Sequence, residues 1–396
     1  MKRDIFKQLV THLDNDQISL IVGARQVGKT TILNQLADYL KLNRQPNHFI
    51  SLEDKTILAL LNEHPKNLLQ LVPILNGTKS FILIDEIQYL EDPSNFLKLI
   101  YDLYKNSIKL IVTGSSSFYI DKKFKDSLAG RKRIFNMYTL SFEEMLRFKG
   151  FEQYIQYLNT GNFPKLYDME IKALINEYML YGGYPQVVLE NNIEDKKLYL
   201  EDIAESYVKK DAIEAGLHES KNYLKILQIL SRQSGSLLNY TNLGNDLNIN
   251  TVTVQRYIHV MRKSFHIGII TPFTTNITKE LTKMPKLYFN DLGLLNHFRR
   301  QFIPIPINKD RGLLFENFVY RRLLDFHGEK NITFWRTQKK QEVDFIVSFD
   351  DGRQRAYEVK YSEKLFNENK YLFFKKTYPK IPLNLIHFDN VYNLDF

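Results

Sequence analysis

A chain of 396 residues is longer than one ordinary hydrophobic core requires, so we expect two or three domains. Hydrophobic residues make up 44% of it and charged residues 25%, as in a soluble globular protein. No apolar run approaches the ~18 residues of a membrane span, and the absence of cysteine excludes disulfides and zinc–thiolate sites. We therefore expect a cytoplasmic protein with no membrane partner. The net charge of +9 favours an acidic partner such as DNA, unless it only confers solubility.

The first 145 residues alternate short apolar segments with helical patterns. Because each predicted strand is joined to the next by a helical pattern, we expect an α/β fold whose parallel sheet carries helices on both faces. Ligands of such sheets bind beyond the carboxyl ends of the strands. The predicted strands are 18–22, 48–52, 81–85, 109–113 and 133–140.

A phosphate-binding loop follows the first of these strands. Residues 23–30, Gly-Ala-Arg-Gln-Val-Gly-Lys-Thr, match G-x-x-x-x-G-K-[ST] and precede a helical pattern at 31–40. This setting favours a nucleotide site over a plain glycine turn, because the loop amides and the helix N-terminus point at phosphates. Lys29 is expected to reach the β- and γ-phosphates, and the Thr30 hydroxyl to bind Mg²⁺. The loop predicts the cofactors ATP and Mg²⁺, held by Gly23, Ala24, Arg25, Gln26, Val27, Gly28, Lys29, Thr30 and Thr31.

Two later strands end in further polar side chains. Strand 81–85 ends in Asp85, expected to bind Mg²⁺, and is followed by Glu86, expected to orient or deprotonate the attacking water. The alternative, a solvated acidic turn, is less favoured because the phosphate loop lies upstream. After strand 109–113, Ser115 is our first choice for a side chain that senses the γ-phosphate, with Thr113 as the rival. Serines after a strand are also common turn formers.

Several motifs resemble a known family. The phosphate loop, Leu-Ile-Asp-Glu-Ile-Gln at 83–88, Val-Thr-Gly-Ser-Ser at 112–116 and Ser-Leu-Ala-Gly-Arg at 127–131 are similar to those of bacterial and archaeal AAA-type P-loop ATPases. The resemblance is strongest to the group whose C-terminal half is an uncharacterised domain, and it continues through segments 181–185, 286–294 and 315–317. It implies a homo-oligomer in which an arginine of a neighbouring subunit completes the site. Arg131 and Arg133 are the candidates, and the alternative is a basic surface turn.

We divide the chain into an ATPase domain at 1–145, a helical lid or connector at 146–220, a winged-helix-like domain at 221–285 and a C-terminal domain at 286–396. The third region contains predicted helices at 223–233, 240–247 and 251–264, with helix-turn-helix spacing. Side chains of its last helix are able to contact DNA, namely Thr251, Thr253, Gln255 and Arg256. The alternative is a module that packs within the protein or binds a protein partner.

The C-terminal region combines a predicted helix, 313–326, with a hairpin of strands 342–349 and 355–361. With a three-residue loop, Asp344 lies opposite Glu358, and Lys360 shares their face. This resembles a small α+β restriction-endonuclease-like core, which implies that Glu316, Asp344 and Glu358 hold Mg²⁺ while Lys360 stabilises charge. The alternative is a cross-strand salt bridge, although Asp344 facing Glu358 is repulsive without a cation.

Two classes of function remain. In the first, the protein is an ATP hydrolase whose nucleotide state controls a C-terminal DNA-binding or nuclease-like module. In the second, it is a slow nucleotide-dependent switch or scaffold that acts through protein contacts and carries an inactive nuclease-like domain.

Overall fold

The computed structural model describes residues 3–73, 78–114, 128–158, 163–217, 220–273 and 284–393. It contains two compact units, which we describe separately. The N-terminal unit comprises Met1–Tyr138 and Lys263–Phe265, and the C-terminal unit comprises Thr139–Arg262 and His266–Phe396.

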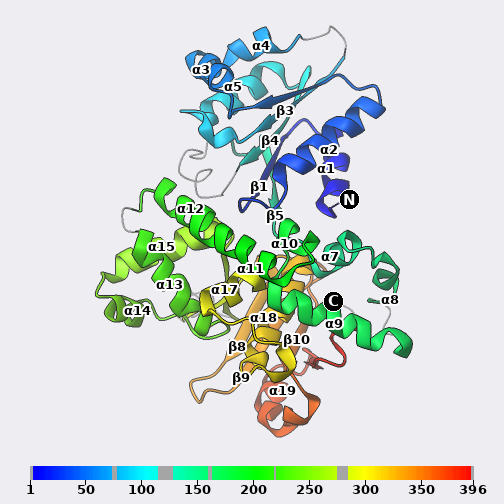
Figure 1. Cartoon of the computed structure of the whole chain (residues 1–396), viewed down its shortest axis with the longest axis vertical. Coiled ribbons are helices and arrows are strands. Elements are labelled where there is room, and N and C mark those ends of the chain that lie inside the picture. Colours follow the sequence, from blue (N-terminus) through cyan, green and yellow to red (C-terminus); the bar gives the residue numbers. More distant parts are fainter. Residues whose placement is uncertain are drawn as a thin grey trace. The chain divides into compact units, whose positions relative to one another are not determined.

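The N-terminal unit is built on a five-stranded sheet with the order β2-β3-β4-β1-β5. All neighbouring strands are parallel, as the sequence predicts. In Figure 1, α1 and α2 cover one face of this sheet and α3, α4 and α5 the other. The strands are β1 (Ile18–Gly23), β2 (Asn47–Ser51), β3 (Ser80–Asp85), β4 (Ile108–Gly114) and β5 (Lys132–Met137). The helices are α1 (Ile5–Thr11), α2 (Lys29–Leu42), α3 (Lys55–Glu63), α4 (Leu68–Leu71) and α5 (Pro93–Tyr104).

The buried strands explain why these segments read as continuous apolar runs. All residues of β1, β3 and β4 are buried, because helices cover both faces of the sheet. Strand β5 ends at Met137, three residues earlier than predicted. The carbonyl of Tyr138 accepts a hydrogen bond from the Arg3 guanidinium at 2.7 Å instead of continuing the ladder.

The C-terminal unit begins with helices. The first, α7, starts at a capping box in which Ser141 and Glu144 exchange hydrogen bonds. The helices up to the second sheet are α7 (Phe142–Phe148), α8 (Ile155–Leu158), α9 (Asp168–Tyr181), α10 (Pro185–Leu189), α11 (Ile193–Asp202), α12 (Lys209–Glu214), α13 (Ser220–Arg232), α14 (Tyr240–Leu247) and α15 (Thr251–Lys263). Helices α13, α14 and α15 overlap the helices predicted at 223–233, 240–247 and 251–264.

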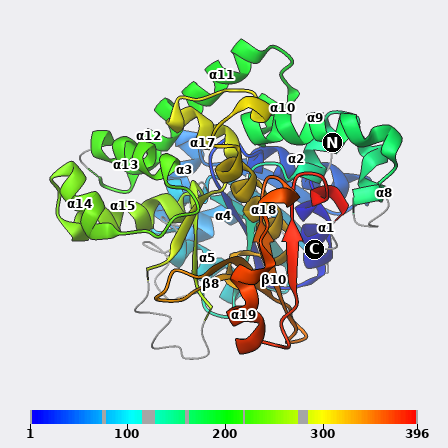
Figure 2. The ribbon, with the colours of Figure 1, turned by 90° about the horizontal axis from the view of Figure 1, so that it is seen from below.

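A mixed six-stranded sheet, ordered β11-β10-β9-β8-β6-β7, completes this unit. Strands β6 and β8 are parallel, so the strands that follow α15 share one sheet with the predicted hairpin. Helix α18 packs against this sheet and lies beside β8 and β10 in Figure 2. The strands are β6 (Ile267–Pro272), β7 (Lys286–Phe289), β8 (Ile332–Arg336), β9 (Glu342–Ser348), β10 (Gln354–Val359) and β11 (Leu383–Ile386). The helices are α17 (Leu292–Arg299), α18 (Arg311–His327) and α19 (Leu372–Thr377).

The glycine motif at 181–185 forms a tight joint with the start of α17. The carboxylate of Asp291 accepts hydrogen bonds from the amides of Gly183 at 2.8 Å and Leu294 at 3.0 Å. A Cβ on Gly293 would lie 2.2 Å from the carbonyl oxygen of Tyr181. The glycine motif at 181–185 and the residues that begin α17 therefore pack α9 against α17. This packing role accounts for both segments without a bound ligand.

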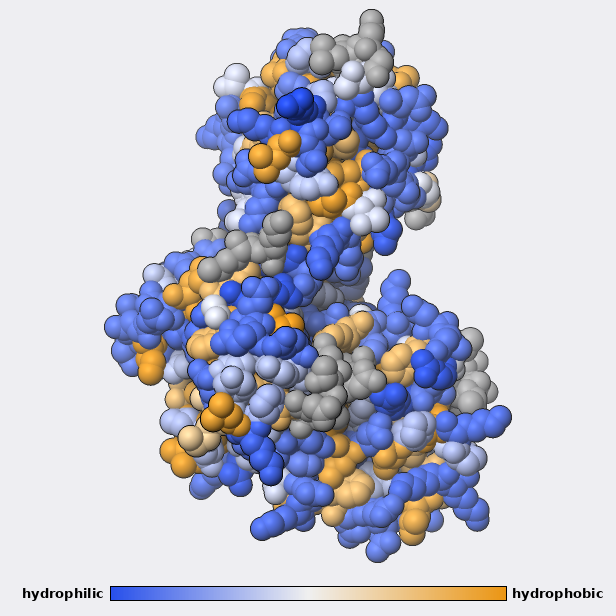
Figure 3. Space-filling view, turned by 90° about the vertical axis from the view of Figure 1, so that its right-hand side faces the viewer, coloured by the Kyte–Doolittle hydropathy of each residue, from blue (hydrophilic) through white to orange (hydrophobic). Residues whose placement is uncertain are grey.

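The surface in Figure 3 is mainly hydrophilic, with hydrophobic residues in scattered groups. Of the helices within the described ranges, none has the length and apolar character needed to cross a bilayer.

Candidate functional site

The phosphate loop joins β1 to α2 in the N-terminal unit. Gly28 has φ 95° and directly precedes α2, and Gln26 also has a positive φ of 61°. A Cβ on Gly23 would lie 2.1 Å from the carbonyl oxygen of Met137, so only glycine fits there. The buried Lys29 ammonium donates to the carbonyls of Gly23 at 3.1 Å and Ala24 at 2.9 Å. The loop is therefore folded around the lysine that the sequence places at the phosphates.

Asp85 receives two threonine hydroxyls at the carboxyl end of β3. Thr30 Oγ1 donates to Asp85 Oδ2 at 2.7 Å, and Thr113 Oγ1 donates to Asp85 Oδ1. The Thr113 hydroxyl also accepts a hydrogen bond from the backbone amide of Glu86 at 3.0 Å. The loop, β3 and β4 thus meet at one buried carboxylate.

Glu86 has a left-handed backbone, with φ 59° and ψ 52°. Such a conformation is uncommon for a residue other than glycine and is often found at functional positions. Its amide is held by Thr113, and its side chain accepts a hydrogen bond from Gln88 Nε2. The side-chain amide of Gln88 therefore holds the carboxylate of Glu86, the residue that directly follows Asp85.

The structure gives different results for the other residues predicted at this site. Ser115 lies outside the described residues, whereas its rival Thr113 contacts both Asp85 and Glu86. Arg131 donates to Asp102 of α5 through Nε at 2.7 Å and Nη2 at 3.2 Å. An arginine acting on a neighbouring subunit would first have to leave this bidentate ion pair.

Among the α15 residues predicted to contact DNA, Arg256 makes contacts within the protein. Arg256 Nη2 lies 3.2 Å from the carbonyl oxygen of Gly216 and 3.4 Å from that of Ala215, at the end of α12. The contact gives Arg256 a packing role, which is the alternative to DNA contact that the sequence left open. A guanidinium can donate hydrogen bonds to the carbonyl groups at the end of a helix. Gln255 is exposed and remains a candidate.

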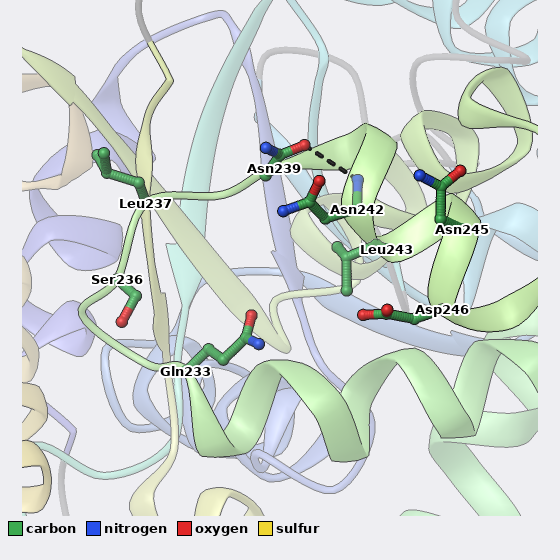
Figure 4. A pocket seen from close by; sticks show the side chains of 8 residues that line it. All are labelled: Gln233, Ser236, Leu237, Asn239, Asn242, Leu243, Asn245 and Asp246. Carbon is green, nitrogen blue, oxygen red and sulfur yellow. Dashed lines mark hydrogen bonds between the residues drawn. The ribbon is translucent and has the colours of Figure 1, made fainter.

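A groove of about 480 Å³ lies beside α14 (Figure 4). Its walls carry amide, hydroxyl, carboxylate and leucine side chains: Gln233, Ser236, Leu237, Asn239, Asn242, Leu243, Asn245 and Asp246. The Asn239 side chain caps α14 by accepting from the amides of Thr241 and Asn242. Because none of these described lining residues is basic, the groove does not suit a phosphate backbone.

The hairpin of β9 and β10 has the predicted register. Tyr357 pairs with Phe345 and Ala356 with Ile346, so Glu358 continues the ladder opposite Asp344. Asp344 Oδ2 accepts from the amide of Val359 at 2.8 Å and lies 3.8 Å from Lys360 Nζ. Lys360 also forms an ion pair with Glu358. The predicted face is therefore assembled, with Lys360 between its two acids.

Lys286 of β7 is a member of this cluster that sequence reasoning missed. Its side chain is 2% exposed, and its ammonium lies 2.6 Å from Glu342 Oε1, 3.6 Å from Glu316 Oε1 and 3.8 Å from Asp344 Oδ1. Tyr288 donates to Glu316 Oε1 at 2.7 Å. In the sequence, Lys286 is recognisable only as a lysine at the start of an apolar strand, which does not indicate that acidic side chains surround it.

Burial dominates the electrostatics of the C-terminal cluster. It raises the pKa of Glu316 and that of Glu358, and Asp344 raises both further. The neighbouring carboxylates outweigh the burial of Lys286 and raise its pKa. Within the described ranges, no group of three histidine or acidic residues has an arrangement that holds a metal ion. The cations that lie against these acids include Lys360 and the buried Lys286.

Residues 15–146 match an AAA domain family. The N-terminal region is an AAA domain. Residues 172–303 and 311–387 match two domains of unknown function, DUF8612 and DUF4143. The chain thus carries an AAA-type P-loop ATPase domain followed by regions whose families have no described function.

Similar full-length proteins are uncharacterized. One from Methanocaldococcus jannaschii is 26% identical over 374 residues, which cover 92% of this chain and 79% of the relative. One from Haemophilus influenzae is 25% identical over 395 residues, covering 96% and 92%.

Among solved structures, the RuvB Holliday junction branch migration motor of Thermotoga maritima aligns with a TM-score of 0.32 and 16% identity, over 72% of this chain and 95% of that one. Domain III of the replication initiation protein DnaA from the same organism aligns with a TM-score of 0.29 and 15% identity, over 50% and 90%.

Proposed function

We propose that the N-terminal unit binds Mg²⁺–ATP and hydrolyses it. The observation that carries this proposal is the hydrogen bond of 2.7 Å between Thr30 and Asp85, which brings a phosphate loop and an acidic strand end together. A hydroxyl and a carboxylate are the hard oxygen donors that suit Mg²⁺. When bound, the ion neutralises charge on the β- and γ-phosphates.

Each residue of this site has a proposed role. The loop amides between Gly23 and Thr30 bind the phosphates, and Lys29 exchanges its carbonyl partners for phosphate oxygens. Glu86 orients the attacking water and accepts its proton. Thr113 fixes the backbone of Glu86 relative to Asp85.

We further propose that nucleotide state controls the output of the C-terminal unit. The net charge of +9 of the whole chain supports an acidic partner such as DNA. The lysine-filled acid cluster supports an output other than metal-dependent cleavage, namely binding of DNA or of a protein. Stimulation of ATP hydrolysis by DNA distinguishes these two partners.

Glu86→Gln tests the enzymatic role. The variant should bind ATP like the wild type and lose at least about 100-fold in turnover, because a glutamine does not accept the proton. Glu91→Gln, an exposed neighbour in the same unit, is the matched control and should hydrolyse ATP normally. Equal turnover of Glu86→Gln and wild type would refute the assignment of Glu86.

A further inference from the structure

The acid cluster of the C-terminal unit is organised around the buried ammonium of Lys286. Three carboxylates lie within 3.8 Å of this nitrogen, two from β9 and one from α18. The backbone of Lys286 is fixed as well: it pairs with Ile270 in the β6–β7 ladder and bridges to Leu237. A side chain that is 2% exposed and held by its strand stays among these acids.

The formal charges of the cluster are nearly balanced when Lys286 is present. A divalent ion beside the lysine would give this buried cluster a net positive charge. Four carboxylates meet three cations, and their members are Glu316, Glu342, Asp344, Glu358, Lys286, Lys360 and Arg336. One negative charge remains with Lys286 present, and two would remain without it. Removal of any one of the three cations would leave the two negative charges that match one divalent ion, and the distances around Lys286 single out this lysine.

The distances lead to the same conclusion. A metal ion bound to carboxylates lies about 2.0–2.6 Å from their oxygens. The Lys286 nitrogen lies 2.6 Å from Glu342 and 3.8 Å from Asp344, so it occupies the space between the acids of β9. An ion bridging the same acids would overlap the ammonium and would be repelled by it.

We propose that Lys286 takes the place of a divalent cation in this cluster and closes it to metal. The cluster then ties β7 to β9 and α18 as an internal ion network. This role is independent of ATP hydrolysis in the N-terminal unit. It requires that removal of the lysine, and not of Lys360, converts the acids into a metal site.

The test is Mn²⁺ binding to the full chain, measured by electron paramagnetic resonance without nucleotide. All variants carry Asp85→Asn, which removes the metal ligand expected in the N-terminal unit. The parent should bind no Mn²⁺ that depends on Asp344. Adding Lys286→Met, which removes the ammonium and keeps an apolar side chain of similar shape, should create about one new site per chain. That site should disappear when Asp344→Asn is added.

Lys360→Ala in the same background is the matched control and should gain no site. Asp344-dependent binding of Mn²⁺ by the parent would overturn the proposal, because metal would then enter beside the lysine. A folded Lys286→Met variant that gains no Mn²⁺ would overturn it too. If Lys286→Met does not fold, Lys286→Gln replaces it, and the comparison of the parent with its Asp344→Asn derivative still decides the first point.

Discussion

At residue scale, the side chain that connects the two acids of the ATPase site is Thr113. Its hydroxyl donates to Asp85 and accepts from the amide of Glu86, which has a left-handed backbone. The sequence offered Ser115 with this residue as its rival, because Thr113 ends the predicted strand and Ser115 follows it closely. Propensity cannot choose between them, since the choice depends on how β4 lies beside β3.

Thr113→Val should therefore slow ATP hydrolysis while ATP binding persists. The substitution keeps the shape of the side chain and removes two hydrogen bonds, so we expect a loss of roughly tenfold in kcat, about 1.4 kcal/mol. Steady-state kinetics and calorimetric titration separate the two effects. The exposed Thr56→Val on α3 is the control. A wild-type kcat for Thr113→Val would remove Thr113 from the site.

His12 makes the stability of the N-terminal unit depend on pH. Burial, with Lys109 and Arg133 nearby, lowers the pKa of His12 to about 4. Between this value and 6.5 the unfolded chain takes up a proton that the folded chain refuses. The free energy of unfolding should thus fall by up to about 3 kcal/mol as the pH drops from 6.5 to 4.

Thermal unfolding of the full chain between pH 7 and 5 checks this, with His12→Gln as the test variant. The variant should lose part of the pH dependence, whereas His48→Gln, on partly exposed β2, should keep it. The same slope in His12→Gln and wild type would contradict the assignment.

At element scale, the joint between α9 and α17 rests on glycines. Gly293→Ala should destabilise the protein by roughly 1–3 kcal/mol, because the new Cβ would meet the Tyr181 carbonyl oxygen at 2.2 Å. Gly312→Ala is the control, since its Cβ meets no atom within 4 Å in α18 and alanine favours a helix. Chemical denaturation followed by circular dichroism compares them. Equal stability of the two variants would show that the joint tolerates a side chain.

Local patterns predicted elements well where the sequence carries the relevant signal. The register of Tyr357 with Phe345 followed from turn length and alternation alone. The contact of Arg256 with Gly216 was not predictable, because a helical period does not reveal which helix end lies opposite an exposed arginine. The winged-helix assignment of α13 to α15 stays a prediction.

At the scale of the whole molecule, sheet order decided what sequence reasoning missed. The sequence predicted both acids of the proposed nucleotide site, Asp85 and Glu86, because they stand next to each other at the end of one strand. Lys286 lies 30 residues before Glu316 in the sequence, and only the placement of β7 brings the two together. Pairing between distant strands leaves no local signal, so Lys286, unlike Lys360, was not predicted as a member of the acid cluster.

Assembly through Arg131 can be tested by mixing two variants. If Arg131 acts on a neighbouring subunit, Arg131→Ala and Glu86→Gln chains should each be inactive alone. A mixture should recover part of the ATPase activity, because a Glu86→Gln chain supplies the arginine to an intact Glu86 site. Asp102→Asn removes the ion pair of Arg131 and should stay active. Normal turnover of Arg131→Ala, or no recovery on mixing, would refute a role in trans.

Every role proposed for the N-terminal unit requires that the phosphate loop and Asp85 bind Mg²⁺–ATP. Calorimetric titration of the full chain with Mg²⁺–ATP tests it most directly, with Lys29→Ala beside the wild type. We predict binding of about one nucleotide per wild-type chain, and a loss of at least about 100-fold in affinity for Lys29→Ala. No heat with the wild type, or equal affinity of the two proteins, would contradict the account.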